Sequence, residues 1–185
     1  MKATGIVRRI DELGRVVIPK EIRRTLRIRE GDPLEIFTDR EGEVILKKYS
    51  PIGELGDFAK EYAESLHNSL EHIAAICDKD VIIAVSGGAK RELMDKSIHE
   101  NVERLIKNRE RAQLSLAKDS QPILITTSDD ESTAYTAATI VPILSQGDAI
   151  GAVMLLSRDA GSVMGTTEMK VCETAANFMG KQMES

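Results

Sequence analysis

The chain has 185 residues, of which 42% are hydrophobic and 30% are charged, and its net charge at neutral pH is −5. This balance is typical of a globular protein and excludes a disordered one. The sequence contains no run of eighteen apolar residues, so it predicts no transmembrane helix. The net charge hides an asymmetry, because residues 1–50 carry a balance of +3 and the remainder carries −8. Such a split indicates contact with nucleic acid or another acidic surface at one end of the chain.

The first fifty residues predict short elements in the order β-β-α-β-β. These are strands at 5–11 and 15–19, a helix at 19–28, and a hairpin with strands at 34–39 and 43–49. Gly14 and Arg15 predict the first turn, and Pro19 suits the first turn of the helix. A domain this small buries too little surface to be stable alone, so we expect two chains to share strands in a dimer.

Basic residues concentrate within the first 29 positions, which hold nine Lys or Arg and only three Asp or Glu. Arg8, Arg15, Arg23 and Arg24 come from a predicted strand, a turn and a helix, so the fold must bring them together. The planar guanidinium suits phosphate oxygens and guanine edges, whereas the low aromatic content of 3% disfavours stacking on single strands. We therefore expect double-stranded DNA as a partner, with a solvated charged face as the alternative.

Residues 51–56, with one proline and two glycines, predict a linker, and residues 57–185 predict a second domain. Its expected elements are an amphipathic helix up to Leu70, strands at 73–77 and 81–86, a helical region at about 90–118, strands at 122–127, 136–145 and 149–157, and a terminal helix. Gln146-Gly147-Asp148 predicts a hairpin turn between the last two strands. We expect an antiparallel-leaning sheet of about five strands with flanking helices, so the whole chain is of the α+β class.

The first and last helices of this domain each carry an apolar stripe at helical spacing, and we expect the two helices to pack together. Broad stripes would also pack against the same pair in another subunit. The candidate oligomerisation residues are Leu55, Ala59, Tyr62, Leu66, Met169, Cys172, Ala176, Met179 and Met183.

Other candidate sites are weaker. His67 and His72 lack metal-ligand spacing, Ser86–Lys90 is better explained as a strand-to-helix turn than as a phosphate loop, and Ser128–Ser132 as a solvated loop. Cys77 and Cys172 are expected to be buried thiols. With no nucleophile–base pair in the sequence, we predict neither an enzyme nor a cofactor. Residues 1–12 have no apolar signal region, so we expect a cytoplasmic protein that does not contact membranes.

Residues 1–37, and residues 11–26 (DELGRVVIPKEIRRTL) above all, resemble the DNA-binding domain of the AbrB-type transition-state regulators. The resemblance covers residues 1–50 and implies a swapped-hairpin β-barrel, in which two chains interleave their strands. It also implies DNA contacts at Arg8, Arg15, Arg23 and Arg24, with Arg9 at a basic position beside them. Members of this family recognise the shape and flexibility of A·T-rich DNA rather than a fixed base sequence.

The domain order resembles that of family members in endospore-forming bacteria whose C-terminal half is a GAF-type sensor domain. This resemblance implies a nucleoid-associated regulator that activates and represses late sporulation genes in the forespore. It also implies a homotetramer joined through helices of the GAF-like domains. A small-molecule ligand of that domain stays open, and the sequence identifies no residue for it.

Two other functions are weighed against this one. The first fifty residues also suit an antitoxin-like partner-binding protein, although such proteins usually carry a disordered acidic tail instead of a second folded domain. An enzyme built on the C-terminal sheet is the third possibility, and the missing catalytic constellation argues against it.

Overall fold

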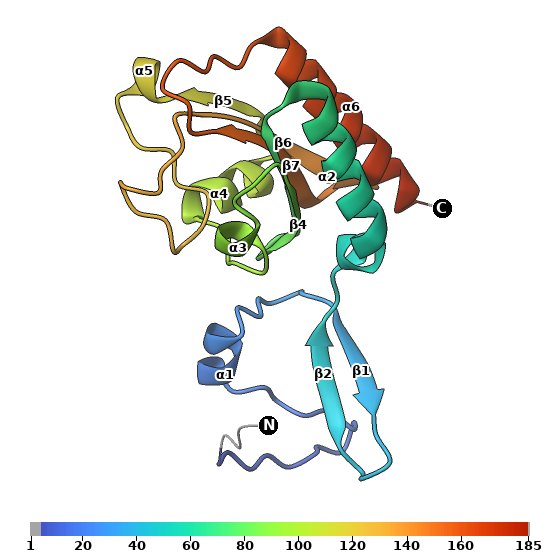
Figure 1. Ribbon diagram of the computed structural model, residues 1–185. Coiled ribbons are helices and arrows are strands. Elements are labelled where there is room, and N and C mark those ends of the chain that lie inside the picture. Colours follow the sequence, from blue (N-terminus) through green and yellow to red (C-terminus); the bar gives the residue numbers. More distant parts are fainter. Residues whose placement is uncertain (1–4, 185) are drawn as a thin grey trace. The chain divides into compact units, whose positions relative to one another are not determined.

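The computed structural model describes residues 5–184, apart from the side chains of residues 54 and 55, and it divides into two compact units, Met1–Tyr49 and Ser50–Ser185 (Figure 1). The predicted linker is not an open segment. Pro51–Leu55 forms a 3-10 helix, η1, whose start is capped when Ser50 Oγ accepts a hydrogen bond from Gly53 N–H. Ile52 is fully buried in the core of the second unit, so this segment is part of that unit.

Over residues 5–49, the first unit contains the short helix α1 (Lys20–Thr25) and an antiparallel hairpin, β1 (Leu34–Thr38) with β2 (Val44–Lys48). The hairpin confirms the sequence expectation. Its turn is held by Asp39, whose Oδ1 accepts hydrogen bonds from the N–H groups of Glu41 and Glu43. A two-stranded hairpin is marginally stable in water by itself.

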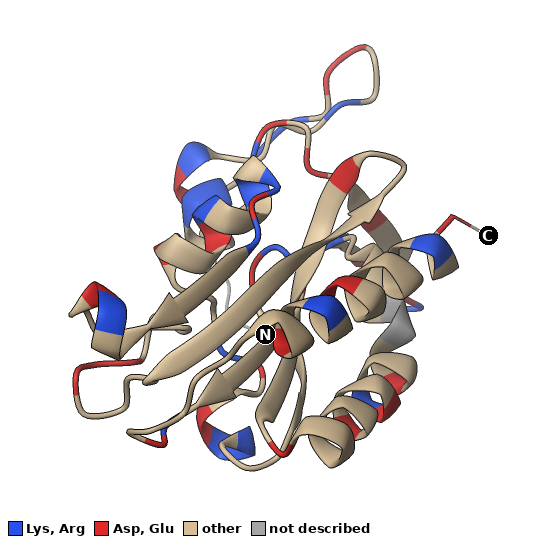
Figure 2. Ribbon diagram, turned by 90° about the horizontal axis from the view of Figure 1, so that it is seen from above, with Lys and Arg blue, Asp and Glu red and all other residues tan. Residues whose placement is uncertain are grey.

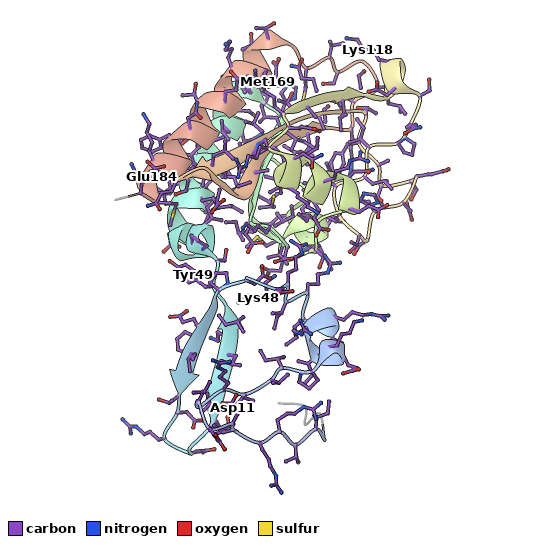
Figure 3. All side chains as sticks on the ribbon, turned by 180° about the vertical axis from the view of Figure 1, so that it is seen from behind. Asp11, Lys48, Tyr49, Lys118, Met169 and Glu184 are labelled. Carbon is purple, nitrogen blue, oxygen red and sulfur yellow. The ribbon has the colours of Figure 1, made fainter. Side chains whose placement is uncertain are left out.

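The two strands predicted at 5–11 and 15–19 are not formed in the single chain, whereas the turn between them is. Asp11 Oδ1 accepts hydrogen bonds from Leu13 and Arg15 N–H, and Gly14 adopts a φ of 77° that favours glycine (Asp11 is labelled in Figure 3). The physical reason for the missing strands is that a strand needs a neighbour to satisfy its backbone groups. Among the described residues, positions 7–19 take part in no strand pairing.

The second unit is built on a five-stranded antiparallel sheet in the order β4-β3-β7-β6-β5. The strands are β3 (Ile73–Cys77), β4 (Ile82–Ser86), β5 (Ala112–Ser115), β6 (Ala137–Ser145) and β7 (Asp148–Ser157). The β6–β7 hairpin turns at Gln146 and Gly147, both at positive φ, as the sequence predicts. Lys, Arg, Asp and Glu lie on the helices and loops and leave the strands almost free of charge (Figure 2).

The predicted helical region at 90–118 is wrong in detail. It contains α3 (Lys90–Leu93), α4 (Glu100–Asn108), strand β5 and α5 (Leu116–Asp119). Asp95 and Arg109 take left-handed backbone conformations that interrupt it, although neither is a glycine. The strand predicted at 122–127 is also wrong, because Ile123 and Thr126 form only isolated bridges and β5 occupies the edge beside β6.

Helices cover both faces of the sheet. Helix α2 (Gly56–Leu70) and helix α6 (Thr166–Gln182) lie side by side on one face, and α3 and α4 lie on the other (Figure 1). The rings of Tyr62 and Phe178 stack with centroids 5.9 Å apart, which confirms that the first and last helices pack together. The strands β6 and β7 are buried on both faces, which explains their nearly continuous apolar sequences.

Candidate nucleic-acid interface

Arg8, Arg9 and Arg15 lie on either side of the turn at Gly14, at positions outside any strand of the described residues. All three are exposed. The turn brings the chain back on itself, because Asp11 N–H donates to the carbonyl oxygen of Arg15 at 3.0 Å. The local sequence therefore places Arg15 at the end of a tight turn and the other two arginines on the arm that leads into it.

Arg23 and Arg24 lie on α1, which begins after Pro19, a buried residue with the φ of −56° that proline imposes. Arg24 is exposed. Arg23 is half-buried, and its Nε atom is buried without a hydrogen-bond partner among the described residues. The structure therefore distinguishes two arginines that the sequence treats alike.

The end of α1 is tied to the hairpin. Lys48 Nζ on β2 donates to the carbonyl oxygen of Arg27 at 2.9 Å and lies 3.5 Å from Asp32 (Lys48 is labelled in Figure 3). Asp32 in turn accepts a hydrogen bond from Arg29 N–H. These contacts fix the helix that carries Arg23 and Arg24 relative to the hairpin.

The charges of these five arginine side chains are not neutralised by ion pairs within the described residues. Among residues 5–184, no carboxylate forms an ion pair with Arg8, Arg9, Arg15, Arg23 or Arg24. Glu12 and Glu21 are exposed nearby in sequence but do not neutralise them by direct contact. Guanidinium groups without internal partners are available to phosphate oxygens.

Large apolar side chains lie exposed between the arginines. Val7 is 86% exposed, Leu13 72% and Val17 69%, and Ile10 and Val16 are exposed as well. Burial of a side chain of this kind stabilises a fold by about 1.5–3 kcal/mol, so leaving five of them in water is costly. The surface that carries the arginines is therefore incomplete in a single chain.

The predicted oligomerisation residues separate into two groups. Ala59, Leu66, Cys172, Ala176 and Met179 are buried against the sheet of their own unit. Packing on that sheet accounts for the apolar stripe at these five positions, and their role in oligomerisation stays a prediction. Tyr62, Met169 and Met183 are only partly buried (Met169 is labelled in Figure 3), and the side chain of Leu55 lies outside the described residues.

Sequence reasoning missed an aromatic cluster on this helical face. Phe58, Tyr62 and Phe178 have ring centroids 5.8 to 5.9 Å apart, and Phe178 is 42% exposed. The spacing of Phe58 and Tyr62, four residues apart on one helix, is the signal that could have found part of it. Burial raises the pKa of Tyr62.

The other candidate sites are structural. His67 Nδ1 lies 2.9 Å from the carbonyl oxygen of His72, so it carries the proton and donates. In the predicted turn at 86–90, Gly87 and Gly88 have positive φ and Gly87 packs on the His67 ring. In the loop at 128–132, Asp129 accepts hydrogen bonds from the N–H groups of Ile125 and Thr126.

Neither cysteine is placed as a nucleophile. Both are buried, and burial raises the pKa of the Cys77 thiol and raises that of Cys172 to about 12. Thiols of this kind stay protonated near neutral pH. Over residues 5–184 no cluster of three or more His, Cys, Asp or Glu could hold a metal ion, and no helix there is long and apolar enough to cross a membrane.

Two family descriptions match the chain. "Stage V sporulation protein T C-terminal, transcription factor" matches residues 54–184, and "Antidote-toxin recognition MazE, bacterial antitoxin" matches residues 7–54. The first covers more than half of the chain. The boundary between the two matches lies close to the division between the two structural units.

Two relatives from Bacillus subtilis (strain 168) match these parts. Stage V sporulation protein T is 60% identical over 184 residues, which cover 100% of this chain and 99% of the relative. Transition state regulatory protein AbrB is 69% identical over 51 residues, which cover 28% of this chain and 52% of that protein.

Among solved structures, the GAF domain from Acinetobacter phosphoenolpyruvate-protein phosphotransferase superposes with a TM-score of 0.57 at 11% identity. The superposition covers 70% of this chain and 81% of that one. At this identity the likeness concerns the fold alone, and it confirms a GAF-like second unit.

Proposed function

The chain belongs to the family of stage V sporulation protein T transcription factors, and on that basis we propose that it activates and represses late sporulation genes in the forespore. It acts in the cytoplasm, associated with the nucleoid, and it is not an enzyme. Its first unit is an AbrB-type DNA-recognition domain. The finer steps of the proposal concern how that unit is completed and how it holds DNA.

Two chains complete the DNA-binding unit by interleaving residues 5–19 with the hairpin β1–β2. The single observation that carries this step is the exposure of the large apolar side chains Val7, Leu13 and Val17, at positions that lie outside any strand of the described residues. A second chain supplies both the missing backbone partners and the cover for these side chains. The two-fold axis then duplicates the arginines, as a duplex can accept.

DNA is held by Arg8, Arg9, Arg15, Arg23 and Arg24 from both chains. Support comes from the exposure of all of these except the half-buried Arg23, and from the absence of internal ion-pair partners for the five among the described residues. Contacts of this kind go mainly to phosphate oxygens, so sequence preference arises from the deformability of A·T-rich DNA. Affinity then falls steeply with salt, because bound phosphates release their counterions.

The GAF-like unit joins two such dimers into a tetramer and is the place for a small-molecule ligand. The surface that supports assembly is the exposed side of the α2–α6 pair, with Tyr62, Met169, Phe178 and Met183. Phe178 is a better centre for this contact than the buried positions of the two stripes, because an exposed aromatic ring gains most from a partner.

A second candidate function is favoured by the match of residues 7–54 to a bacterial antitoxin family. In that case the same arginine-bearing unit binds an acidic protein partner. The folded second unit, with its buried core, argues for the regulator, because it leaves no long unstructured tail among residues 50–184 to wrap a toxin.

The test is binding of the full chain to a labelled A·T-rich duplex over a salt series. For wild type we expect log affinity to fall linearly with log salt. Each change of Arg8, Arg15, Arg23 or Arg24 to alanine removes two contacts per dimer and reduces the slope by roughly two. The matched control is Arg104→Ala on α4, an exposed arginine of the second unit, which leaves the slope unchanged.

Sedimentation must show that the variants stay oligomeric. Wild-type protein that binds no duplex at low salt would contradict the DNA proposal and move the antitoxin-like function to the front. A slope that falls equally in Arg104→Ala would contradict the assignment of the four arginines tested.

A further inference from the structure

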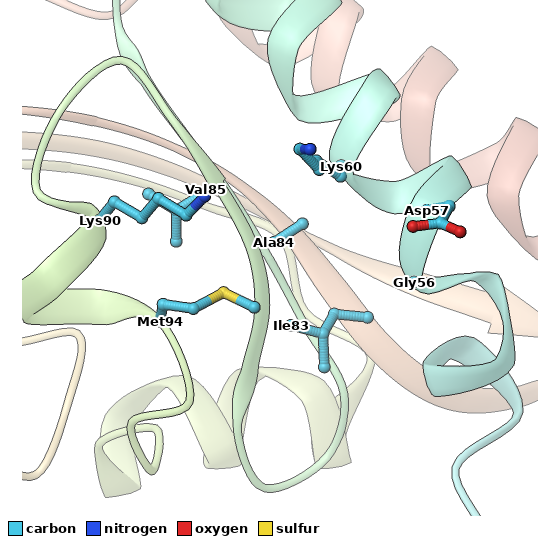
Figure 4. A pocket seen from close by; sticks show the side chains of 8 residues that line it. All are labelled: Gly56, Asp57, Lys60, Ile83, Ala84, Val85, Lys90 and Met94. Carbon is cyan, nitrogen blue, oxygen red and sulfur yellow. The ribbon is translucent and has the colours of Figure 1, made fainter.

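A pocket of about 230 Å³ opens beside β4, the strand at one edge of the sheet in the second unit (Figure 4). It lies between the first turns of α2, the strand itself and the short helix α3. The side chains that matter for its chemistry are Asp57, Lys60, Ile83, Val85, Lys90 and Met94. Of these residues, only Lys90, at the end of the turn at 86–90, is considered from sequence, and no ligand is assigned there.

A bulge in the edge strand forms the floor of this pocket. The register pairs Ala84 with Ile76 and Ile82 with Cys77, so Ile83 is an extra residue without a partner on β3. Ile83 packs toward the core half under α2 and α6, whereas Met94 packs toward the half under α3 and α4. Bulges at sheet edges redirect side chains in this way, and they are frequent next to binding sites.

Two lysine side chains lie beside this apolar floor. Lys60 on α2 and Lys90 at the start of α3 extend toward β4 from opposite sides (Figure 4). Both residues are exposed, and within residues 5–184 neither ammonium group has an ion-pair partner. Asp57 also lines the pocket, so the lining carries two positive charges and one negative charge.

Charge and size together select the ligand. A lining with an excess of one positive charge suits a monoanion better than a polyphosphate. The volume is below the roughly 300–1,000 Å³ of most ligand sites, so the pocket suits a small molecule better than a nucleotide. The floor of Ile83, Val85 and Met94 favours an apolar portion next to the charge.

We propose that this pocket binds a small carboxylic acid with an apolar chain. The carboxylate lies between Lys60 and Lys90, and the chain covers Ile83, Val85 and Met94. The occupied pocket then joins α2 to α3 across the open edge of the sheet. This assignment names a ligand class for the GAF-like unit, and the binding itself does not depend on how the first unit holds DNA.

The experiment is calorimetric titration of the full chain, without DNA, with acetate, butyrate, hexanoate and octanoate, and with inorganic phosphate as the bare anion. We expect saturable binding that strengthens up to about fourfold for each added methylene until the floor is covered. Lys60→Gln and Lys90→Gln should each weaken hexanoate binding about fivefold. Lys118→Gln, an exposed lysine on α5, is the control and should bind as wild type does.

Met94→Ala tests the apolar part, and we expect it to flatten the dependence on chain length while acetate binding stays the same. Absence of saturable binding by every acid overturns the proposal, as does phosphate binding as tightly as hexanoate. Equal weakening in Lys118→Gln also overturns it, since attraction would then be non-specific. Duplex binding of Lys60→Gln, measured separately, distinguishes a failure here from a failure of the DNA proposal.

Discussion

The second unit buries most of its large apolar side chains against its own sheet, whereas the first unit leaves Val7, Ile10, Leu13, Val16 and Val17 exposed. The two units also differ in how their backbones are satisfied. Every strand of the second unit pairs within the chain, but residues 7–19 form no strand in the described part of the first. The second unit is therefore complete as a single chain, and we propose that the first needs a second chain to complete it.

The largest effect is expected at Gly151 on β7, where a Cβ atom would overlap the carbonyl oxygen of Cys77 on the neighbouring strand. Gly151→Ala should destabilise the second unit by about 3 kcal/mol or more, because backbone must move in the middle of the sheet. Denaturant unfolding followed by circular dichroism measures this. Gly161→Ala is the control, because nothing lies within 4 Å of its added Cβ, and a comparable loss there would show that the close approach is not the cause.

The next effect tests whether the first unit is half of a structure. Val16→Asp places a charge where we propose that a second chain covers the side chain, and we expect a loss of roughly 2–3 kcal/mol from the first unit. Duplex binding should disappear while the unfolding of the second unit is unchanged. Val163→Asp, at a residue 74% exposed in the second unit, should leave both intact. Retained duplex binding in Val16→Asp would contradict the proposal that a second chain covers this side chain in the first unit.

A smaller effect concerns the start of α6. Glu168 accepts a hydrogen bond from Gly165 N–H at 2.6 Å, and this bond, the largest cause, lowers the pKa of the carboxyl below its ordinary 4.5; His72, 3.9 Å away, adds to the shift. Since the folded pKa is lowered, the stabilisation is present above pH 4.5 and is lost as pH falls through the folded value.

Glu168→Ala should cost about 1 kcal/mol at neutral pH, as capping losses do. Glu168→Gln retains the hydrogen bond and should cost less, but its unfolding free energy should no longer decline with acid at this position. Urea melts at several pH values separate the two variants. An acid dependence equal to that of wild type in Glu168→Gln would contradict this assignment.

The smallest effect is expected at Glu92, which pairs with Arg158 at 2.6 Å while the guanidinium lies 4.7 Å from the centre of the Tyr135 ring. The hydrogen bond from Arg158 lowers the pKa of Glu92, but the pair is largely exposed. Glu92→Gln should therefore change the unfolding free energy by only about 0.5 kcal/mol. A thermal melt at low and high salt checks this, since a screened pair loses its contribution at high salt.

Prediction from sequence succeeded where a local signal and the tertiary fold agree. The hairpin at β1–β2, the hairpin at Gln146 and Gly147, and the apolar strands β6 and β7 each combine turn residues with the right periodicity. Sequence-based prediction failed between residues 90 and 127. Asp95 and Arg109 take left-handed conformations at the ends of helices, and neither is a glycine, the residue that usually marks such an end. The edge strand β5, with the sequence AQLS, has no strand signal, and its pairing with β6 is set by the tertiary fold.

The candidate sites divide in the same way. The arginine set stays a prediction from sequence, made because charge and residue type carry the chemistry of phosphate recognition. The half-burial of Arg23 could not, since it depends on how α1 packs. The sequence drew attention to Lys90 through the turn at 86–90, but it could not assemble the pocket beside β4. Lys60 and Lys90 are thirty positions apart, and the bulge at Ile83 is visible only in the strand register.

The uncovered apolar segment of the first unit has a consequence for gene dosage. Where two chains are needed to build one DNA-reading surface, the amount of that surface at low abundance rises with the square of the amount of chain. A doubling of synthesis then yields about four times as many reading surfaces. The activity of such a regulator therefore rises more steeply than its own concentration when its expression begins.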